Sequence, residues 1–486
     1  MSCYEFRSQF IDGHWKDGSD SQASSDVDPF SGALLFEVRC ASVEDVDAAY
    51  SAAATAQRSW AATSPAARSI IFRRAAEIVE RRRTEIVDWL IRESGSTRIK
   101  AEIECRAVQE GMLEAASIPY RTTGLILPID TPDTESRVYR KPIGVVAVIS
   151  PWNFPLHLSH RTVGPALATG NAVVIKPAEE TPITGGLLLA RLYEEAGLPA
   201  GLLNVVTGSS RTIGDAFCTH DIPRFISFTG STEVGRRIGR LAIEARVIKR
   251  VALELGGNNP LVVLDDADLD RAVEAATLGR FLHQGQICMS TNRVIVEAGI
   301  YDAFLARLVS AVEQVQHGDP ASSGTLVGPA FNAKQFAQNM KHIEDARSRL
   351  RQVVGGDPVG TVIPPHIFAD VENADPLAQT EMFGPILFVI KARDEDHALE
   401  LANATEAGLS SAVFTQDEAR GLRFALGIEA GMTHINDMTV ADMPFNPFGG
   451  EKNSGMGRFG GDWIIEELTT THWVTVRRPA RVPVIS

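Results

Sequence analysis

Cys288 stands in a setting that suits a nucleophilic thiol. It follows Gln284, Gly285 and Gln286, so two amide side chains and a glycine that permits close backbone approach precede it. A nucleophilic cysteine needs access, nearby backbone donors and a lowered thiol pKa. We interpret the remaining cysteines as small buried apolar side chains, and their scattered positions argue against disulfides and against a bound metal: Cys3, Cys40, Cys105 and Cys218.

A candidate general base lies upstream of this cysteine. Glu254 stands in an apolar stretch, between Leu253 and Leu255 and directly before a glycine pair. An unpaired carboxylic acid in such a place would have a raised pKa, which suits proton abstraction near neutral pH. The alternative, a glutamate on the wet face of an edge strand, stays open at this point.

Two strand ends carry residues that could bind a nucleotide. The turn from Gly230 to Gly235 follows a buried apolar run and opens a helix, so its backbone N–H groups could face a pyrophosphate. Lys176 and Glu179 end another run, where an acidic side chain can accept hydrogen bonds from a ribose diol. Each feature also has a simpler interpretation, a structural glycine turn in one case and a surface salt bridge in the other.

The pattern along the chain predicts an α/β protein with two doubly wound parallel sheets. Residues 41–116 have helical periodicity, and a further helix is predicted from Thr181-Pro182 to Gly197. Short apolar runs that alternate with helical segments predict strands buried on both faces, in two series: 145–149, 173–175, 203–206 and 225–228, then 261–264, 294–296, 386–390, 411–414 and 433–436. Residues 124–141 and the tail from about 466 fit neither series, and they could pair with another subunit or form a peripheral hairpin.

Composition excludes several classes of function. The 486 residues carry 47 Lys and Arg against 61 Asp and Glu, a net charge of −14, and 44% are hydrophobic. Such a chain is long enough for two or three domains, and its acidity argues against nucleic acid or an anionic membrane as partner. The polar N-terminus and the absence of a long apolar run favour a cytoplasmic protein.

Seven motifs in order make the chain resemble the aldehyde dehydrogenase superfamily. Cys288 lies 34 positions after Glu254, which is the separation found in that family. The motifs are SPWNFP at 150–155, VIKPAEETP at 174–182, FTGSTEVG at 228–235, LELGGNN at 253–259, GQIC at 285–288, EMFGP at 381–385 and PFGGEKNSGMGR at 447–458. Softer markers at 153–161, 281–289, 364–371 and 457–473 are similar to the bacterial benzaldehyde and vanillin dehydrogenase branch.

The resemblance implies roles for the catalytic residues. Cys288 would attack the aldehyde, with the Asn153 side chain and the Cys288 backbone N–H stabilising the oxyanion. Glu254 would activate the water that hydrolyses the thioester. Its presence favours a free carboxylic acid as product over transfer of the acyl group to coenzyme A. NAD is the implied cofactor, with NADP left open beside Lys176, and the implied cofactor-binding residues are Trp152, Lys176, Glu179, Gly230, Ser231, Gly235, Glu381 and Phe383.

The resemblance also implies an aldehyde pocket and an oligomer. If residues 153–161 are helical, Asn153, His157 and Arg161 share one face, and Arg161 or His157 could reach a phenolic hydroxyl; the alternative is a structural salt bridge or an interface contact. The pocket residues are Phe154, His157, Arg161, Ile287 and Met289. The implied parts are a Rossmann-like cofactor domain at 1–123 and 142–256, a catalytic domain at 257–465, and a small β oligomerisation appendage at 124–141 and 466–486, in a homodimer or homotetramer.

The substrate is an aromatic aldehyde in this interpretation. Two alternatives stay open, the same chemistry on an aliphatic aldehyde or semialdehyde, and a catalytically silent nucleotide-binding scaffold.

Overall fold

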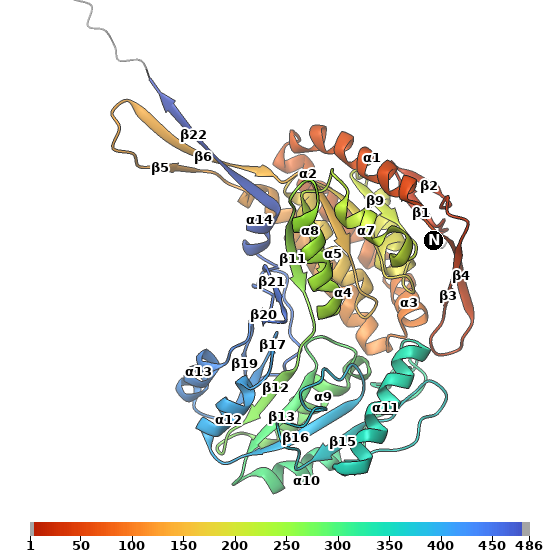
Figure 1. Cartoon of the computed structure of the whole chain (residues 1–486), viewed down its shortest axis with the longest axis vertical. Helices are drawn as coiled ribbons and strands as arrows, with labels where there is room; N and C mark the ends of the chain where they lie inside the picture. Colours follow the sequence, from red (N-terminus) through yellow and green to blue (C-terminus); the bar gives the residue numbers. More distant parts are fainter. Residues whose placement is uncertain (1–3, 479–486) are drawn as a thin grey trace, which may run out of the picture.

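Two lobes and a projecting arm make up the molecule (Figure 1). The structure is a computed structural model that describes residues 4–478, so Cys3 and the last residues of the predicted segment 466–486 lie outside the described part. Each lobe is built on one sheet with helices packed against it, which confirms the predicted α/β class with two doubly wound sheets.

The upper lobe of Figure 1 contains an eight-stranded sheet. Its strand order is β2 (His14–Lys16), β1 (Gln9–Ile11), β9 (Leu203–Val206), β8 (Ala172–Lys176), β7 (Val145–Ile149), β10 (Phe225–Thr229), β11 (Arg250–Glu254) and β21 (Gly455–Met456). The strands from β9 to β11 are mutually parallel, and their Val, Ile and Phe side chains are almost all buried. The predicted strands of the first series are therefore confirmed.

Helices from the first half of the chain cover this sheet. Their bounds are α1 (Val43–Ala61), α2 (Pro65–Arg81), α3 (Arg83–Ser94), α4 (Arg98–Arg121), α5 (Pro155–Ala168), α6 (Leu188–Glu195), α7 (Ser210–Thr219) and α8 (Thr232–Glu244). Ser42 and Asp45 form a reciprocal capping box at the start of α1, and Ser64 caps α2 before Pro65. These local signals act as the sequence predicts because they satisfy backbone N–H groups that no helical carbonyl can reach.

The helix predicted from Thr181 begins differently. Residues Ile183–Leu187 form a π-helical turn, η1, before the regular α6, and the Thr181 hydroxyl has no hydrogen-bond partner within the described chain. The carboxylate of Glu93 on α3 accepts the N–H groups of Ile183 and Thr184, both at 2.7 Å. A buried tertiary carboxylate thus takes the place of the predicted local cap.

The lower lobe contains a seven-stranded sheet. Its order is β14 (Arg351–Val354), β15 (His366–Ala369), β16 (Ile386–Ala392), β13 (Thr291–Glu297), β12 (Asn259–Val263), β18 (Ala412–Phe414) and β19 (His434–Ile435), and all but β14 pair in parallel. The helices of this lobe are α9 (Leu269–Phe281), η2 (Leu282–Gly285), α10 (Tyr301–Val312), α11 (Ala333–Arg349), α12 (Glu395–Asn403) and α13 (Glu418–Gly427). The predicted second series is confirmed, with β14 and β15 added by the structure.

The two segments that fitted neither series meet in the arm. Strands β5 (Leu125–Leu127), β6 (Thr134–Pro142) and β22 (Thr469–Arg477) form a three-stranded antiparallel sheet that projects beyond the upper lobe (Figure 1). Helix α14 (Trp463–Leu468) leads into β22, and the remaining short pairs are β3 (Ala23–Val27) with β4 (Leu34–Arg39) and β17 (Ala407–Gly408) with β20 (Glu451–Lys452). The predicted domain boundaries stay a prediction; β21, from the range assigned to the catalytic domain, pairs with β11 of the first sheet.

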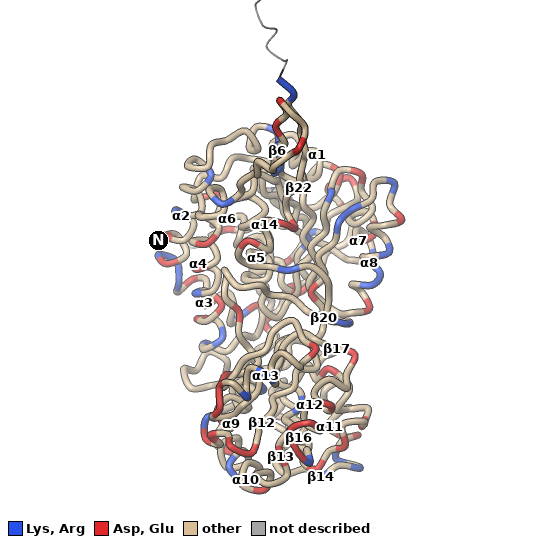
Figure 2. The backbone as a smooth tube through the Cα atoms, turned by 90° about the vertical axis from the view of Figure 1, so that its left-hand side faces the viewer, with Lys and Arg blue, Asp and Glu red and all other residues tan. Residues whose placement is uncertain are grey.

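Charge of both signs is interspersed over both lobes (Figure 2). Within residues 4–478, no helix combines the length and the apolar character needed to cross a bilayer. The same residues contain no group of three His, Cys, Asp or Glu side chains arranged to hold a metal ion.

A buried ion pair fixes the start of α5 against α4. The side chains of Lys100 and Glu104 pair one helical turn apart, and both are fully buried. The Glu104 carboxylate also accepts the backbone N–H groups of Leu156 and His157 at 2.9 and 3.1 Å, which are orphan donors of the first turn of α5. The pair therefore positions the helix that carries His157 and Arg161.

Replacing Lys100 by methionine should destabilise the protein strongly. The substitution leaves Glu104 as a buried carboxylate without its cation, so we expect the free energy of unfolding to fall by about 3–5 kcal/mol. Urea unfolding followed by circular dichroism measures the change. The control R237M removes an exposed cation paired with Asp215, and its unfolding curve should overlay that of the parent protein. An unchanged K100M curve would contradict the assignment.

Candidate active site

The candidate residues meet where the edges of the two sheets face one another. Strands β7, β8, β10 and β11 run in parallel, so Asn153, Lys176, Gly230 and Glu254 all lie at or just beyond their carboxyl ends. Cys288 precedes β13 of the second sheet, and the residues before β12 and β16 lie at the same edge. Ligands of open parallel sheets bind beyond the carboxyl ends of the strands, so this junction is the candidate active site.

The thiol of Cys288 and the carboxylate of Glu254 lie in direct contact. The Cys288 Sγ is 3.4 Å from Glu254 Oε1 and donates its hydrogen to it. Glu254 is almost fully buried as the last residue of β11, whereas Cys288 is half-buried. The two residues that sequence reasoning singled out for chemistry are thus brought together.

The resting thiol does not have the lowered pKa that the sequence argument required. Loss of water raises the pKa of Cys288 well above its usual value, and the neighbouring Glu254 carboxylate raises it further, while Arg161 acts in the opposite direction. The thiol is therefore protonated at neutral pH. It needs a base to become a nucleophile, and Glu254 is the group in position to take the proton.

A strained loop presents Cys288 to the cleft. His283, Gln284 and Gly285 have φ values of +51°, +48° and +74°, three consecutive left-handed residues. The Gln284 amide holds this conformation through hydrogen bonds to Pro329 O at 2.7 Å and from Gly328 N at 2.9 Å. Gln286 Oε1 accepts Phe331 N at 3.0 Å. The two amides noted in the sequence therefore support the loop.

Asn153 lies beside the same loop. Its Nδ2 donates to the backbone carbonyl of Gln286 at 2.9 Å, two residues before the nucleophile. Helix α5 begins at Pro155, so His157 and Arg161 share a helix face but Asn153 precedes the first turn. The prediction of one shared face thus holds for two of the three residues, because the proline at position 155 starts the helix.

Arg161 pairs with Glu254, so the expectation of an unpaired carboxylate is wrong. Its Nη1 lies 3.0 Å from Glu254 Oε2, which also accepts the Thr229 hydroxyl at 3.2 Å. The same guanidinium lies 3.5 Å from Asp442, and His157 Nε2 lies 2.8 Å from that carboxylate. Sequence reasoning missed Asp442, whose position five residues before the PFGG motif is the only local signal for it.

Arg161 and His157 line a hollow between α4, α5 and α14. Asp442, Met443 and Phe448 contribute to the same wall. The other predicted pocket residues lie deeper: Ile287 and Met289 are buried, and Phe154 packs edge-on against the His283 ring at 5.8 Å. The structure thus places His157 and Arg161 on the wall of this hollow and Phe154, Ile287 and Met289 around the catalytic loop.

Lys176 and Glu179 converge on the start of α7. Lys176 Nζ donates to Ser210 Oγ at 3.0 Å, and Glu179 Oε1 accepts Ser210 N at 2.6 Å. Lys176 is 2% exposed, so it is not the solvated lysine of the salt-bridge alternative. Burial lowers its pKa, against the attraction of Glu179 and Glu180. Lys176 Nζ also donates to Pro177 O at 3.5 Å, and an ammonium group with these two partners still has a donor for a ribose or phosphate oxygen.

The Gly230 turn combines a ligand feature with a packing feature. Ser231 is the N-cap of α8, but its side chain makes no capping hydrogen bond, so the first N–H groups of the helix are left for an anion. Packing explains the glycine at position 235, because a Cβ there would lie 2.4 Å from the Leu255 side chain. Gly235 therefore allows α8 to approach the segment after β11.

Glu381 reaches into the cleft beside the glycine pair of the LELGGNN motif. Gly257 N donates to Glu381 Oε1 at 3.1 Å, and a Cβ on Gly256 would lie 2.3 Å from Glu381 Oε2. Burial raises the pKa of Glu381 to about 7, although the Gly257 N–H and the Arg280 cation favour its charged form. The glycines thus leave room for a carboxylate that could accept hydroxyl groups of a ribose.

Aromatic side chains form one wall of this part of the cleft. Trp152 stacks on Phe331 with ring centroids 4.1 Å apart and meets the edge of Phe383 at 5.4 Å. The fully buried Arg280 on α9 donates to the carbonyls of Met382 and Gly384 and so fixes the loop that carries Glu381 and Phe383. Sequence reasoning missed Phe331 and Arg280, and an arginine within the apolar face of α9 was the signal for the latter.

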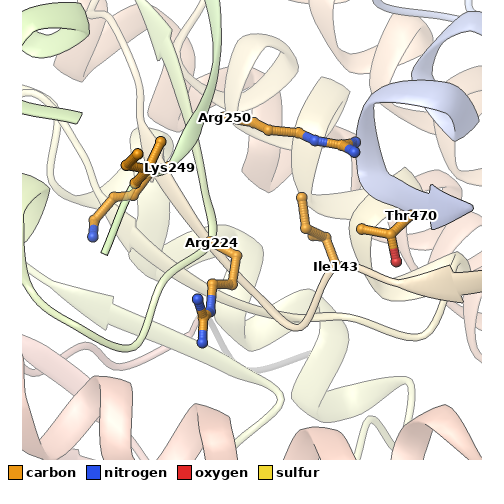
Figure 3. Close-up of a pocket in the computed structure, with 6 residues that line it drawn as sticks. Ile143, Arg224, Lys249, Arg250 and Thr470 are labelled. Atoms are coloured by element: carbon orange, nitrogen blue, oxygen red, sulfur yellow. The ribbon is translucent and has the colours of Figure 1, made fainter. Parts of the chain in front are cut away.

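A second hollow lies at the opposite edge of the first sheet (Figure 3). Ile143, Arg224 and Arg250 stand at the amino ends of β7, β10 and β11, and Ile248, Lys249 and Thr470 complete the lining. The catalytic candidates stand at the carboxyl ends of the same strands. This basic hollow is therefore separated from Cys288 by the length of the sheet.

Comparisons with known proteins agree with this geometry. The model of the aldehyde dehydrogenase family matches residues 15–474. The chain is 54% identical to a vanillin dehydrogenase of Corynebacterium glutamicum, over 96% of this chain and 97% of the relative, and 45% identical to a benzaldehyde dehydrogenase of Bacillus subtilis, over 98% of each. The crystal structure of an NAD-dependent benzaldehyde dehydrogenase from Corynebacterium glutamicum superposes with a TM-score of 0.91 at 50% identity, covering 98% of this chain and 99% of that one. From its sequence, its fold and the contact between thiol and carboxylate, this chain belongs to the aldehyde dehydrogenase family.

Proposed function

We propose that this enzyme oxidises aromatic aldehydes to free carboxylic acids with NAD. The observation that carries the proposal is the 3.4 Å contact between Cys288 Sγ and Glu254 Oε1 at the junction of the two sheets. The substrate class and the cofactor are supported by the names of the relatives, which include vanillin and benzaldehyde dehydrogenases and an NAD-dependent enzyme.

The first half of the reaction makes a bond between Cys288 and the aldehyde carbon. Glu254 takes the thiol proton, and the thiolate adds to the carbonyl to give a thiohemiacetal oxyanion. Asn153, once its Nδ2 turns from Gln286 O to the substrate, and the Cys288 backbone N–H would donate to that oxyanion. The buried surroundings of Glu254 strengthen each of these interactions.

The second half releases the acid. When bound, NAD would supply the acceptor for the hydride that leaves the thiohemiacetal carbon, and Cys288 would be left as a thioester. Glu254, after passing the thiol proton to solvent, then removes a proton from the attacking water; the carbon–sulfur bond breaks, and Glu254 returns a proton to the released thiolate. Because Glu254 is present to activate water, the product is a free acid.

The cofactor site favours NAD and leaves NADP open. Glu179 would repel a 2′-phosphate at short range, whereas the buried Lys176 would attract it. Ser231 and the first turn of α8 would face the pyrophosphate, Glu381 the nicotinamide ribose, and Phe383 with Trp152 the nicotinamide. The fit rests on the uncapped Ser231 and on the space that Gly256 leaves beside Glu381.

Apolar side chains lie beside Cys288, where the aldehyde would bind. Ile287, Met289 and Phe154 supply apolar surface beside Cys288, which suits an aromatic ring. A contact from His157 or Arg161 to a phenolic hydroxyl stays a prediction, beside the salt bridges that both residues make with Asp442.

Activity assays on an aldehyde panel should separate the substrate classes. NADH formation is followed by the absorbance of reduced nicotinamide. We expect rapid turnover of benzaldehyde and vanillin and slower turnover of hexanal and succinate semialdehyde. The variant C288A should turn over none of the four aldehydes. The variant E254Q should lower kcat by about 10²–10⁴-fold, because it removes general-base catalysis. The exposed-site variant R237M serves as the control with unchanged activity.

Other outcomes of this assay have distinct meanings. Rapid turnover of the aliphatic aldehydes alone would replace the proposed substrate class and keep the mechanism. A folded protein without turnover of any aldehyde, in the presence of NAD or NADP, would favour the silent scaffold.

Binding of NAD should weaken as the pH falls through about 7. The pKa of Glu381 is about 7, so this carboxylate is charged above that pH and protonated below it, and only the charged form accepts both ribose hydroxyls. We expect the Kd for NAD, measured by titration calorimetry, to rise severalfold from pH 8 to pH 6. E381Q should bind more weakly with little pH dependence between these values; an equal dependence in E381Q would show that another group titrates.

The arm supports the further proposal of a homo-oligomer. Strand β5 exposes three consecutive apolar side chains, of which Ile126 is 78% exposed, and Trp473 on β22 is 65% exposed. The outer strands of the arm, β5 and β22, have unpaired edges that a second copy of the chain could extend or cover.

The substitution I126D should dissociate the oligomer. A charge in the middle of the apolar strand would be buried without a partner in the interface, so we expect the mass measured by light scattering to fall to that of one chain. L426D changes an equally exposed leucine, on α13, and should keep the parent mass. An unchanged mass for I126D would contradict a role of the arm.

A further inference from the structure

Arg161 is shared between two buried carboxylates next to the nucleophile. Its Nη1 lies 3.0 Å from Glu254 and its Nη2 lies 3.5 Å from Asp442. All three side chains are largely buried, with 9% of the Arg161 side chain, 1% of Glu254 and 17% of Asp442 exposed. One cation therefore stands between two anions in a place with little water to screen them.

The surroundings fix where this guanidinium lies. It stacks over the Phe448 ring at 4.0 Å and lies 5.5 Å from the Phe459 ring. Asp442 is held in turn by His157 Nε2 at 2.8 Å, from one turn earlier on α5. Burial acts to raise the pKa of Asp442, but Arg161 and His157 outweigh it and the pKa is lowered, so this carboxylate stays charged. Asp442 thus anchors Arg161 independently of Glu254.

The position of Glu254 depends on this arrangement. Its Oε2 accepts the Thr229 hydroxyl and lies 3.0 Å from Arg161 Nη1, an ion pair without hydrogen-bond geometry, and the other oxygen, Oε1, faces Cys288 Sγ. A carboxylate held at one oxygen in this way presents the other in a defined orientation. The charged groups that face the thiol are Glu254, Arg161 and Glu381.

We propose that Arg161 is a positioning residue, anchored by Asp442, that holds Glu254 toward Cys288 and so sets how readily the thiol loses its proton. The inference rests on the proposed roles of Cys288 and Glu254 in the reaction. It assigns to Arg161 and Asp442 a function in the chemistry that is separate from contact with the aldehyde.

Alkylation of Cys288 tests this without aldehyde or NAD. The purified protein and its variants are treated with iodoacetamide between pH 6 and pH 10, and the peptide that contains Cys288 is followed by mass spectrometry. The pH midpoint of the rate reports the ionisation of the thiol. We expect R161M to raise this midpoint by about one unit or more, since it removes a cation beside the thiol and leaves the charge of Glu254, which raises the thiol pKa, uncompensated.

Two further variants separate positioning from loosening of the fold. D442N removes the anchor of Arg161, so the guanidinium is held less firmly beside Glu254 and the thiol, and the midpoint should move up, in the same direction as R161M but by less. In the E254Q background, adding R161M should shift the midpoint by less than half as much, because the part of the effect that passes through Glu254 is gone. The matched control is R83M, which also removes an arginine shared by two carboxylates, Glu80 and Glu102, and it should leave the midpoint unchanged.

Steady-state kinetics supply a second readout. R161M should lower kcat about 10-fold or more with a small change in the KM for benzaldehyde, as expected for an effect on proton transfer. Equal R161M shifts with and without Glu254, or a D442N variant that keeps the parent midpoint, would overturn the proposal. So would an R161M variant that keeps the parent midpoint and kcat but discriminates less between hydroxylated and plain benzaldehydes, which is the signature of a substrate contact. In each of these cases, loss of activity in C288A and E254Q would leave the proposed function standing.

Discussion

The site depends on one electrostatic constraint, a carboxylate that is buried against a thiol. Glu254 ends β11 with almost no exposure, and burying a charge without a partner is costly. Arg161 at 3.0 Å supplies the compensating charge, and Asp442 and Phe448 hold the guanidinium in turn. The helix that carries Arg161 is itself fixed by Glu104 at its first turn. A series of buried ion pairs and hydrogen bonds thus connects α4 to Cys288.

This constraint explains why the catalytic parts come from both lobes. The first sheet delivers Glu254, Lys176 and the Gly230 turn at the carboxyl ends of its strands, and the second sheet delivers Cys288 and Glu381 from loops that enter its strands. Parallel strands make this possible because all their carboxyl ends lie at one edge. In the proposed mechanism the thiol is activated by a carboxylate of the other lobe, so its reactivity would depend on the relative position of the two lobes.

Local backbone strain is concentrated beside the same residues. Three left-handed residues precede Cys288, and glycines at 256 and 257 admit Glu381 and the Cys288 carbonyl where any side chain would collide. The side-chain amides of Gln284 and Gln286 and the guanidinium of Arg280 hold these loops through backbone groups far away in sequence. Stability elsewhere in the fold thus supports a conformation that the loop would not adopt alone.

The sequence by itself determined the strands, the helix caps and the residues with chemical capacity. Runs of Val and Ile, Ser-Pro at a helix start, and Cys288 and Glu254 in their motifs act over a few residues, and the structure places them as predicted. Only the tertiary structure decided the electrostatics: Arg161 and Asp442 lie 281 positions apart, Glu93 replaces the expected cap of Thr181, and the Cys288 pKa is raised rather than lowered. Charge interactions depend on distance and on lost water, and neither can be read from spacing along the chain.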